Sequence, residues 1–198
     1  TLLATSPSVE YRAVTTDGET HDVYNPSMLP PQDRLAEVQE PWVDLTIISP
    51  ASYIGILIEL VKSRRGEYVR MEYIQTGLDN GGKTSPTNNT RVLLEFCMPL
   101  SEMLVDFYDH LKSKTQGYAS MDYSVSRYRA DKLVRLDILV NGEPVDALSV
   151  IVHRDIAYVK GRDLVSRLKN LIPRQLFEVA LQAAIGNRIM ARETIKAL

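Results

Sequence analysis

Between residues 41 and 128, segments typical of β-strands alternate with amphipathic helical segments in one fixed order. Residues 42–48 read Trp-Val-Asp-Leu-Thr-Ile-Ile, a run rich in strand-forming side chains. The segment that follows has helical spacing, with apolar residues on one face at Ile54, Leu57, Ile58 and Val61. Ser52 is of the type that caps a helix N-terminus, and Gly66 can adopt the left-handed conformation that ends one. We therefore expect a strand over residues 42–48, followed by a helix between Ser52 and Gly66.

The remainder of this region completes the pattern. Strands are expected over residues 68–76, 91–98 and 118–128, and a second helix over residues 101–116, ended by Gly117. Residues 77–90, rich in Gly, Asn and Thr, are expected to form a long hairpin loop. With right-handed crossovers, this order gives the ferredoxin-like split βαβ arrangement, an antiparallel sheet with two helices on one face. We predict an α+β protein with this domain at residues 41–130.

Residues 131–198 predict a second, smaller α+β domain built from hairpins and one helix. Residues 133–140 alternate cleanly, turn at Asn141-Gly142 and return over residues 144–152, a strong hairpin signal. A helix should follow, with its apolar face at Leu164, Val165, Leu168 and Leu171. A last hairpin is expected from residues 177–184 and 188–195.

The N-terminal segment is interpreted as the last strands of a preceding domain. Thr16-Asp17-Gly18 lies between two extended segments and predicts a hairpin that is too short to bury a core by itself. We therefore assign residues 1–30 to the trailing strands of a preceding domain and residues 31–40 to a linker. The chain opens at Thr1 rather than at Met, so we expect it to be part of a longer protein.

Charge is distributed unevenly along a chain whose formal net charge is only −2. Residues 1–40 carry two basic and seven acidic residues, whereas residues 160–198 carry eight basic and three acidic residues. A basic end on a nearly neutral chain indicates an anionic partner, although an ordinary solvated helix face would look similar. The RNA-contact candidates are Lys160, Arg162, Arg167, Lys169, Arg174, Arg188, Arg192 and Lys196.

Residues 116–123, Gln-Gly-Tyr-Ala-Ser-Met-Asp-Tyr, partly match the RNP1 signature of RNA-binding RRM domains. The match fails at Gln116, where a basic residue belongs, and at Ser120, where a stacking aromatic belongs. The segment also falls on the fourth strand rather than the third. We therefore favour a structural role, with small residues at Ala119 and Ser120 where a helix crosses closely.

No residue pattern predicts catalysis or a metal site. His21, His110 and His153 have no metal-ligand spacing, and His153-Arg154-Asp155 is interpreted as a salt-linked corner. Residues 77–84 contain glycines and Lys-Thr, but they are not expected to open a helix as a P-loop does. Cys97 lies in an apolar run, so we expect a buried thiol in a reducing compartment. No signal peptide and no apolar run approaching the ~20 residues of a membrane span is present.

Several segments together resemble the LepA family of ribosome-dependent translation factors, also called elongation factor four. The resembling segments are residues 114–123, 140–149, 153–155, 171–179, 182–186 and 191–196. A related segment marks the equivalent domain of elongation factor G, whereas the later segments resemble LepA alone. The resemblance covers nearly the whole chain.

This resemblance implies a division of labour. Residues 1–30 would end domain III, residues 41–130 would be the ribosome-seated domain V, and residues 131–198 would begin a LepA-specific domain whose basic surface reaches tRNA. The parent would bind GTP and Mg²⁺ and hydrolyse GTP on the ribosome, in reverse translocation or in translation fidelity under stress. Its implied location is the cytoplasm, with peripheral association at the cytoplasmic face of the cell membrane. The present chain is expected to be a monomer without a catalytic centre or cofactor.

Two alternatives remain open from the residues themselves. One is a free-standing ferredoxin-like RNA-binding module, which would stack bases on Tyr118 or Tyr123. The other is a small acyl-phosphate or phosphate-ester hydrolase. That enzyme needs an anion cradle after the first strand, and this strand ends instead at Ser49-Pro50.

Overall fold

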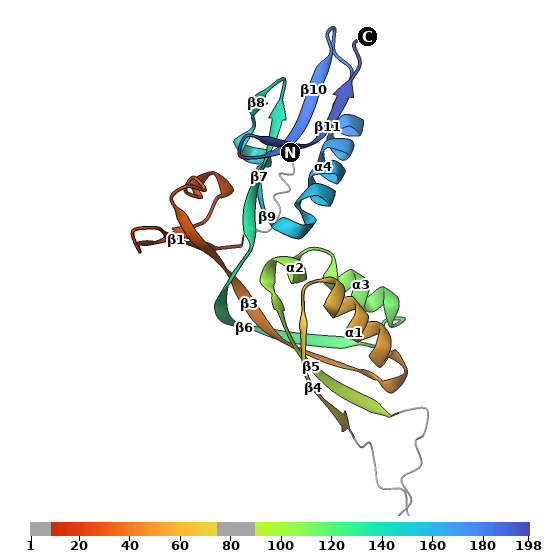
Figure 1. Ribbon diagram of the computed structural model, residues 1–198. Helices are drawn as coiled ribbons and strands as arrows, with labels where there is room; N and C mark the ends of the chain where they lie inside the picture. The colour runs from red at the N-terminus through yellow and green to blue at the C-terminus, as the bar shows by residue number, and fades with distance from the viewer. Residues whose placement is uncertain (1–8, 75–89) are drawn as a thin grey trace, which may run out of the picture. The chain divides into compact units, whose positions relative to one another are not determined.

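The computed structural model describes residues 9–74 and 90–198. These residues divide into two compact units, whose elements are labelled in Figure 1. Unit 1 contains Val9 and residues 40–129, and unit 2 contains residues 10–39 and 130–198. The long loop predicted over residues 77–90 lies outside the described residues except for Thr90. The predicted division of the chain at residues 30, 40 and 130 stays a prediction, and residues 35–40 of the predicted linker belong to a strand.

Unit 1 has the predicted ferredoxin-like order of elements. In chain order these are β3 (Leu35–Pro50), α1 (Ile54–Ser63), β4 (Glu67–Ile74), β5 (Arg91–Pro99), α2 (Leu100–Leu104), α3 (Phe107–Lys114) and β6 (Ser120–Asp131). The sheet runs β6-β3-β5-β4, and β5 pairs antiparallel with both β3 and β4. Figure 1 shows α1 and α3 on the same face of this sheet. The α+β class and the split βαβ topology are therefore confirmed.

The core of unit 1 follows from the two-residue period of its strands. In β5, Val92, Leu94, Phe96 and Met98 are buried, whereas the intervening residues face away from the helices. The buried side chains pack against Leu57 and Val61 of α1 and against Phe107 and Leu111 of α3. Burial of these apolar surfaces, at ~25 cal/mol per Å², is the main stabilisation of the unit.

Cys97 does not belong to this core, and the prediction that it is buried is wrong. It alternates with Phe96 and Met98, so its side chain lies on the other face of the sheet and is partly exposed. Its Sγ lies 3.1 Å from Oδ1 of Asp44 on β3. Burial raises the pKa of the Cys97 thiol, and the hydrogen bond to the Asp44 carboxylate raises it further.

The first helix begins and ends differently from the prediction. Ser52 lies in a 3-10 turn, η2 (Ala51–Tyr53), and α1 starts after it without a side-chain cap. The left-handed residue that follows α1 is Arg65, with φ of 60°, and not Gly66. Gly66 is required for space instead, because a Cβ atom there would lie 2.2 Å from Cγ1 of Val61.

The second predicted helix is broken into α2 and α3. Asp106 adopts a left-handed conformation, with φ of 52°, between the two. Arg64 stabilises this break, because its guanidinium donates to the Val105 carbonyl at 3.1 Å and lies 2.6 Å from Asp106 Oδ1. Helical periodicity in the sequence continues through this point, so the break depends on a residue from another helix.

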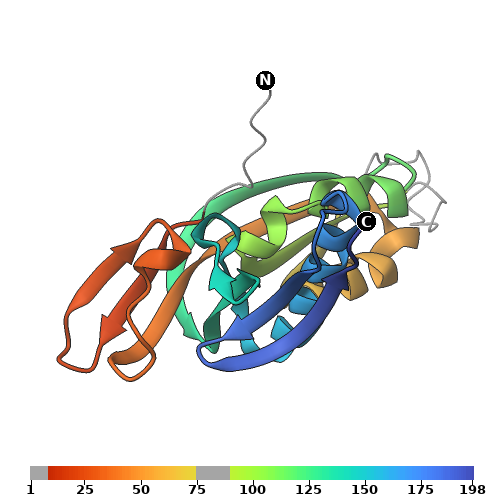
Figure 2. The same ribbon diagram turned by 90° about the horizontal axis from the view of Figure 1, so that it is seen from above.

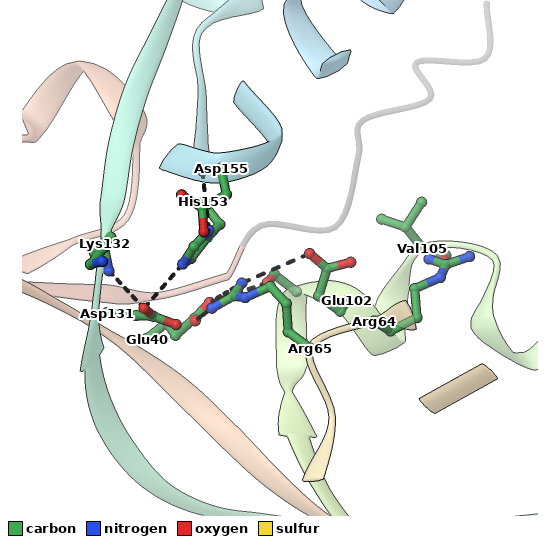
Figure 3. A network of polar contacts seen from close by, with 10 residues as sticks. Glu40, Arg64, Arg65, Glu102, Val105, Asp131, Lys132, His153 and Asp155 are labelled. Carbon is green, nitrogen blue, oxygen red and sulfur yellow. Dashed lines mark hydrogen bonds and ion pairs between the residues drawn. The ribbon is translucent and has the colours of Figure 1, made fainter. Parts of the chain in front are cut away.

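A buried carboxylate also lies in unit 1. Glu40 is 1% exposed and forms an ion pair with Arg65, as Figure 3 shows. Arg65 also lies 3.8 Å from Glu102, and Ser101 Oγ donates to Glu40 at 3.4 Å. A buried charge is tolerated only with such partners, so this network fixes α1 and α2 against the end of β3.

The described residues of unit 2 form two antiparallel hairpins, three further strands and one long helix. The elements are β1 (Tyr11–Thr15), β2 (Thr20–Val23), β7 (Leu133–Val140), β8 (Glu143–Pro144), β9 (Val150–His153), α4 (Ala157–Leu171), β10 (Val179–Ile185) and β11 (Arg188–Ile195). The predicted hairpin at Asp17-Gly18 is confirmed by β1 and β2. Strand β1 also pairs with the first part of β3, whereas a separate sheet runs β11-β10-β7-β8, with β9 also paired to β7. Figure 2 shows α4 against β10 and β11.

The return strand predicted over residues 144–152 is interrupted. Asn141 and Gly142 form the predicted turn, both with positive φ. However, β8 has only two residues and gives way to a 3-10 turn, η3 (Asp146–Leu148), before β9 begins. Ser149 Oγ donates to Oδ1 of Asp137 at 2.8 Å and anchors this detour to β7. Across residues 9–74 and 90–198, no helix is long and apolar enough to cross a membrane.

Candidate nucleic-acid interface

Helix α4 positions half of the predicted RNA-contact residues. Ala157, Gly161 and Val165 recur every four residues and form its buried stripe. Gly161 allows a close approach to β10, because a Cβ atom there would lie 3.0 Å from Cβ of Ala183. The remaining faces of the helix are exposed and carry its basic side chains.

The basic residues of α4 form two separate flanks. Arg162 and Lys169 are seven residues apart, which is two helical turns, so they lie on one side of the helix. Lys160 and Arg167 have the same spacing and lie on the other side of the buried stripe. The structure therefore does not gather the four predicted contacts of α4 on a single face.

Two of the predicted residues are engaged in ion pairs within the chain. Arg167 Nε lies 2.9 Å from Asp163, one helical turn earlier, and Lys169 Nζ lies 2.7 Å from Glu193 of β11. Both pairs are solvent-exposed, so each contributes at most about 1 kcal/mol and can exchange with an external phosphate. The other six predicted residues make no ion pair with any residue in the described ranges; they are Lys160, Arg162, Arg174, Arg188, Arg192 and Lys196.

Strand β11 sends one predicted residue away from the helix. Ala191 and Ile195 belong to or pack on the core beneath α4, and Glu193 contacts Lys169 of that helix. Because side chains alternate along a strand, Arg192 points to the opposite face of the sheet. Arg188 lies at the start of β11, beside the turn formed by residues 186 and 187.

The segments that carry Arg174 and Lys196 meet beyond the C-terminal end of α4. The backbone N–H of Leu198 donates to the carbonyl of Gln175 at 2.9 Å, which holds the end of the chain beside the segment that follows the helix. Lys169, in the last turn of α4, lies at the same end. The segments that carry three basic residues thus meet at this end of the helix, and we call these residues the helix-end cluster: Lys169, Arg174 and Lys196.

Exposed apolar side chains lie in the same segment as Arg174, and the sequence pattern did not predict their exposure. Phe177 was expected to begin a strand, but β10 begins at Val179 and Phe177 is 64% exposed. Leu176 is 86% exposed and Leu171 is 77% exposed. An aromatic side chain beside cations is the combination used by proteins that bind unpaired nucleotides.

The RNP1-like segment has the structural role that its departures from the signature favour. Ala119 is fully buried, its N–H donates to Thr115 Oγ1 at 3.1 Å and its carbonyl accepts from Lys112 Nζ at 2.6 Å. Gly117 has positive φ, as a helix stop requires, and so has Gln116. Ser120 is exposed, so the expectation of a close helix crossing holds at Ala119 and is wrong at Ser120.

The histidine predictions are also resolved by contacts. His153 Nε2 lies 3.1 Å from Asp131, and its Nδ1 accepts from the backbone N–H of Asp155, which forms the predicted corner. His110 is exposed on α3 near Asp106 and Arg64. Among the residues that the structure describes, no group of His, Cys, Asp and Glu side chains is arranged to hold a metal ion.

Residues 77–84 have the residue spacing of a P-loop but not its structural setting. Gly77 followed by Gly82-Lys83-Thr84 satisfies the P-loop spacing of Gly-x4-Gly-Lys-Thr. These residues lie outside the described ranges. The flanking described elements are β4 and β5, antiparallel neighbours in one sheet, whereas a P-loop joins a strand to a helix.

Comparison with known proteins agrees with the family resemblance. The family model described as the GTP-binding protein LepA C-terminus matches residues 140–198. The model described as the elongation factor G C-terminus matches residues 81–139. The second match includes β5, α2, α3 and β6, and the first includes α4 with the helix-end cluster.

Along its whole length, this chain is similar to part of several proteins named elongation factor 4. The chain is 50% identical over 197 residues to that of Campylobacter fetus subsp. fetus and to that of Desulforudis audaxviator, covering 100% of this chain and 31% of each relative. It is 50% identical over 196 residues to that of Latilactobacillus sakei subsp. sakei, covering 99% of this chain and 30% of the relative. The chain thus spans about a third of the length of these relatives, and along that stretch it is similar to proteins of the LepA family, also known as elongation factor 4.

Proposed function

We propose that this chain is the portion of a LepA-type translation factor that docks on the ribosome and on tRNA. The parent would be a GTP-hydrolysing factor, with GTP and Mg²⁺ bound elsewhere in its length. Reverse translocation or translation fidelity under stress would be the process served, in the cytoplasm. Peripheral association of the parent with a membrane and a monomeric state of this chain remain predictions.

The observation that carries the proposal is the set of unpaired cations on unit 2. Six of the eight candidate side chains are free to meet phosphates, and three basic residues lie with exposed Phe177 at the end of α4. Side chains of this kind hold the phosphate backbone of RNA without reading its sequence. The chain would therefore contribute positioning rather than chemistry.

The docking role predicts a salt-dependent loss of ribosome binding when these charges are removed. We expect the triple variant Arg162→Gln, Arg174→Gln and Lys196→Gln to bind ribosomes at least about tenfold more weakly. The slope of log affinity against log salt should fall by about 2, because each phosphate contact contributes roughly 0.7–0.9. Co-sedimentation of the chain with ribosomes over a range of salt concentrations measures both quantities.

A matched variant keeps the charge and changes only the side chains: Arg162→Lys, Arg174→Lys and Lys196→Arg. This variant should bind ribosomes nearly as tightly as the unsubstituted chain, because phosphate neutralisation depends mainly on charge. Wild-type affinity and salt slope in the triple glutamine variant would exclude this surface as the docking site.

A further inference from the structure

Unit 2 contains a cleft that none of the predicted RNA contacts touches. Two hollows, of about 230 and 240 Å³, lie between residues 29–38 and the start of β7. Both are lined by Gln32, Leu35, Leu133 and Val134, so they adjoin each other, and the pair of hollows is called the cleft below. Together they fall within the ~300–1,000 Å³ typical of sites for small ligands.

One end of the cleft is apolar. It is lined by Leu29, Pro30 and Pro31 on one side and by Leu133 and Ile185 on the other. Arg135 also lines this end, but its charge is engaged by Asp137 at 3.1 Å. Walls of this kind suit a flat, largely apolar ring such as a nucleobase.

The exposed amide of Gln32 adds hydrogen-bonding capacity to this apolar end. Gln32 lines both hollows and makes no hydrogen bond with another described residue. A side-chain amide offers two donors and an acceptor, the groups needed to meet the edge of a base. Base recognition at this point would therefore need no rearrangement of the core.

The other end of the cleft is polar and carries two cations, Lys132 and Arg154. The backbone N–H of Arg154 donates to the carbonyl of Lys132 at 2.8 Å, which fixes the two residues side by side. Neither side chain forms an ion pair with a residue of the described ranges. Two neighbouring cations without ion-pair partners among the described residues are suited to a phosphate group.

The carboxylates near this pair do not cancel it. Figure 3 shows Asp131 between His153 and the backbone of Lys132. Its Oδ1 lies 3.1 Å from His153 Nε2 and accepts the N–H of Lys132 at 2.8 Å. Glu37 lines the same end and accepts from Gln39 Nε2 at 2.5 Å, which leaves its second oxygen available. Carboxylates in such positions accept hydrogen bonds from ribose hydroxyls.

We propose that this cleft binds one unpaired nucleotide of an RNA strand. The base occupies the apolar end beside Gln32, the phosphate contacts Lys132 and Arg154, and the ribose 2′-hydroxyl donates to Glu37. The inference rests on the proposed function for the source of the RNA, but it uses none of the residues assigned there to docking. Recognition of the 2′-hydroxyl is what distinguishes RNA from DNA at such a site.

The test follows backbone amide signals of the ¹⁵N-labelled 198-residue chain by NMR during titration. A single-stranded RNA oligomer should shift the signals of Gln32, Leu133 and Val134. The same sequence as DNA or as duplex RNA should shift them much less. In the double variant Lys132→Gln and Arg154→Gln, the affinity reported by these signals should fall at least about tenfold, and the salt slope by about 1.

Two further variants separate the parts of the site. Arg34→Gln removes one exposed cation two residues from Gln32 that does not line the cleft, and it should behave like wild type. Gln32→Ala should weaken binding of single-stranded RNA without unfolding the chain, because this side chain is exposed. Thermal unfolding of each variant checks that the fold is retained.

Several outcomes would overturn the proposal. These are unshifted cleft signals, equal binding of RNA and DNA, equal binding of single strand and duplex, a double variant that matches Arg34→Gln, or binding of adenosine monophosphate but not of the oligomer. Ribosome binding distinguishes this failure from that of the proposed function. If the signals of the cleft residues do not shift but the triple glutamine variant binds ribosomes more weakly, the docking role stands. If ribosome binding by the triple variant is unchanged, docking itself is contradicted.

Discussion

The sequence assigns the end of α1 to Gly66 alone, but in the structure Arg65 and Gly66 share this role. Arg65 takes the left-handed conformation, which costs a non-glycine residue about 1–2 kcal/mol. Its ion pairs with Glu40 and Glu102 offset this cost. Gly66 is needed because Val61 leaves no room for a side chain. The glycine is thus fixed by packing and not by its backbone angle.

We expect Gly66→Ala to lower the free energy of unfolding by about 1–3 kcal/mol, because the new methyl group overlaps Val61. Urea unfolding followed by circular dichroism measures the change. Gly55→Ala is the matched control, since a Cβ atom there meets nothing within 4 Å. That variant should stabilise α1 by up to about 1 kcal/mol. Equal effects of the two variants would contradict the packing argument.

Cys97 is predicted to react slowly with iodoacetamide at neutral pH. Burial and the hydrogen bond to Asp44 raise the pKa of its thiol, so the reactive thiolate forms only at higher pH than in a free cysteine. Asp44→Asn removes the carboxylate, which should lower this pKa and shift the pH–rate curve toward neutral pH. Alkylation rates measured by mass spectrometry across pH test the sign; an unshifted curve would show that Asp44 has no influence.

At the scale of elements, the break between α2 and α3 is the clearest departure from the sequence pattern. Periodicity predicts that Leu104, Val105, Tyr108 and Leu111 share one buried face. In the structure Leu111 is buried and Leu104 packs partly against the core, but Val105 and Tyr108 are about half exposed. The change of direction at Asp106 rotates α3 relative to α2, and Arg64 from α1 holds it.

Asp106 should therefore be sensitive to substitution in a particular order. Asp106→Ala should destabilise unit 1 by about 1–2 kcal/mol, because alanine tolerates positive φ poorly and the contact with Arg64 is lost. Asp106→Gly loses the same contact but adopts positive φ freely, so it should cost less. Chemical denaturation of both variants gives the comparison. A glycine variant less stable than the alanine variant would contradict a left-handed residue at this break.

At the scale of the whole molecule, uneven charge is visible in the sequence but its arrangement is not. The excess of basic residues after residue 160 follows from counting. Its division into two flanks of α4, a cluster at the end of that helix and one side chain on the far face of β11 depends on where the core lies. The cations that are free could be recognised only once Asp163 and Glu193 were seen beside Arg167 and Lys169.

The cleft of unit 2 shows the same dependence more strongly. Its lining comes from residues 29–32, 35–38, 131–135, 154 and 185–186, which are far apart in the chain. Lys132 and Arg154 became candidate phosphate ligands only because a backbone hydrogen bond joins them. No periodicity or motif could have paired them, since neither lies on an apolar stripe or in a recognisable loop.

By itself, the sequence determined the order of strands and helices, the turns at Asp17-Gly18 and Asn141-Gly142, and the resemblance to LepA proteins. These depend on local periodicity, on turn chemistry and on motif residues, all of which are encoded within short stretches. Only the tertiary structure decided where helices break, which face Cys97 occupies, which cations are free and where a cleft opens. Those features depend on contacts between residues distant in the chain. The interaction energies of such contacts cannot be read from the periodicity or the turn residues of a short segment.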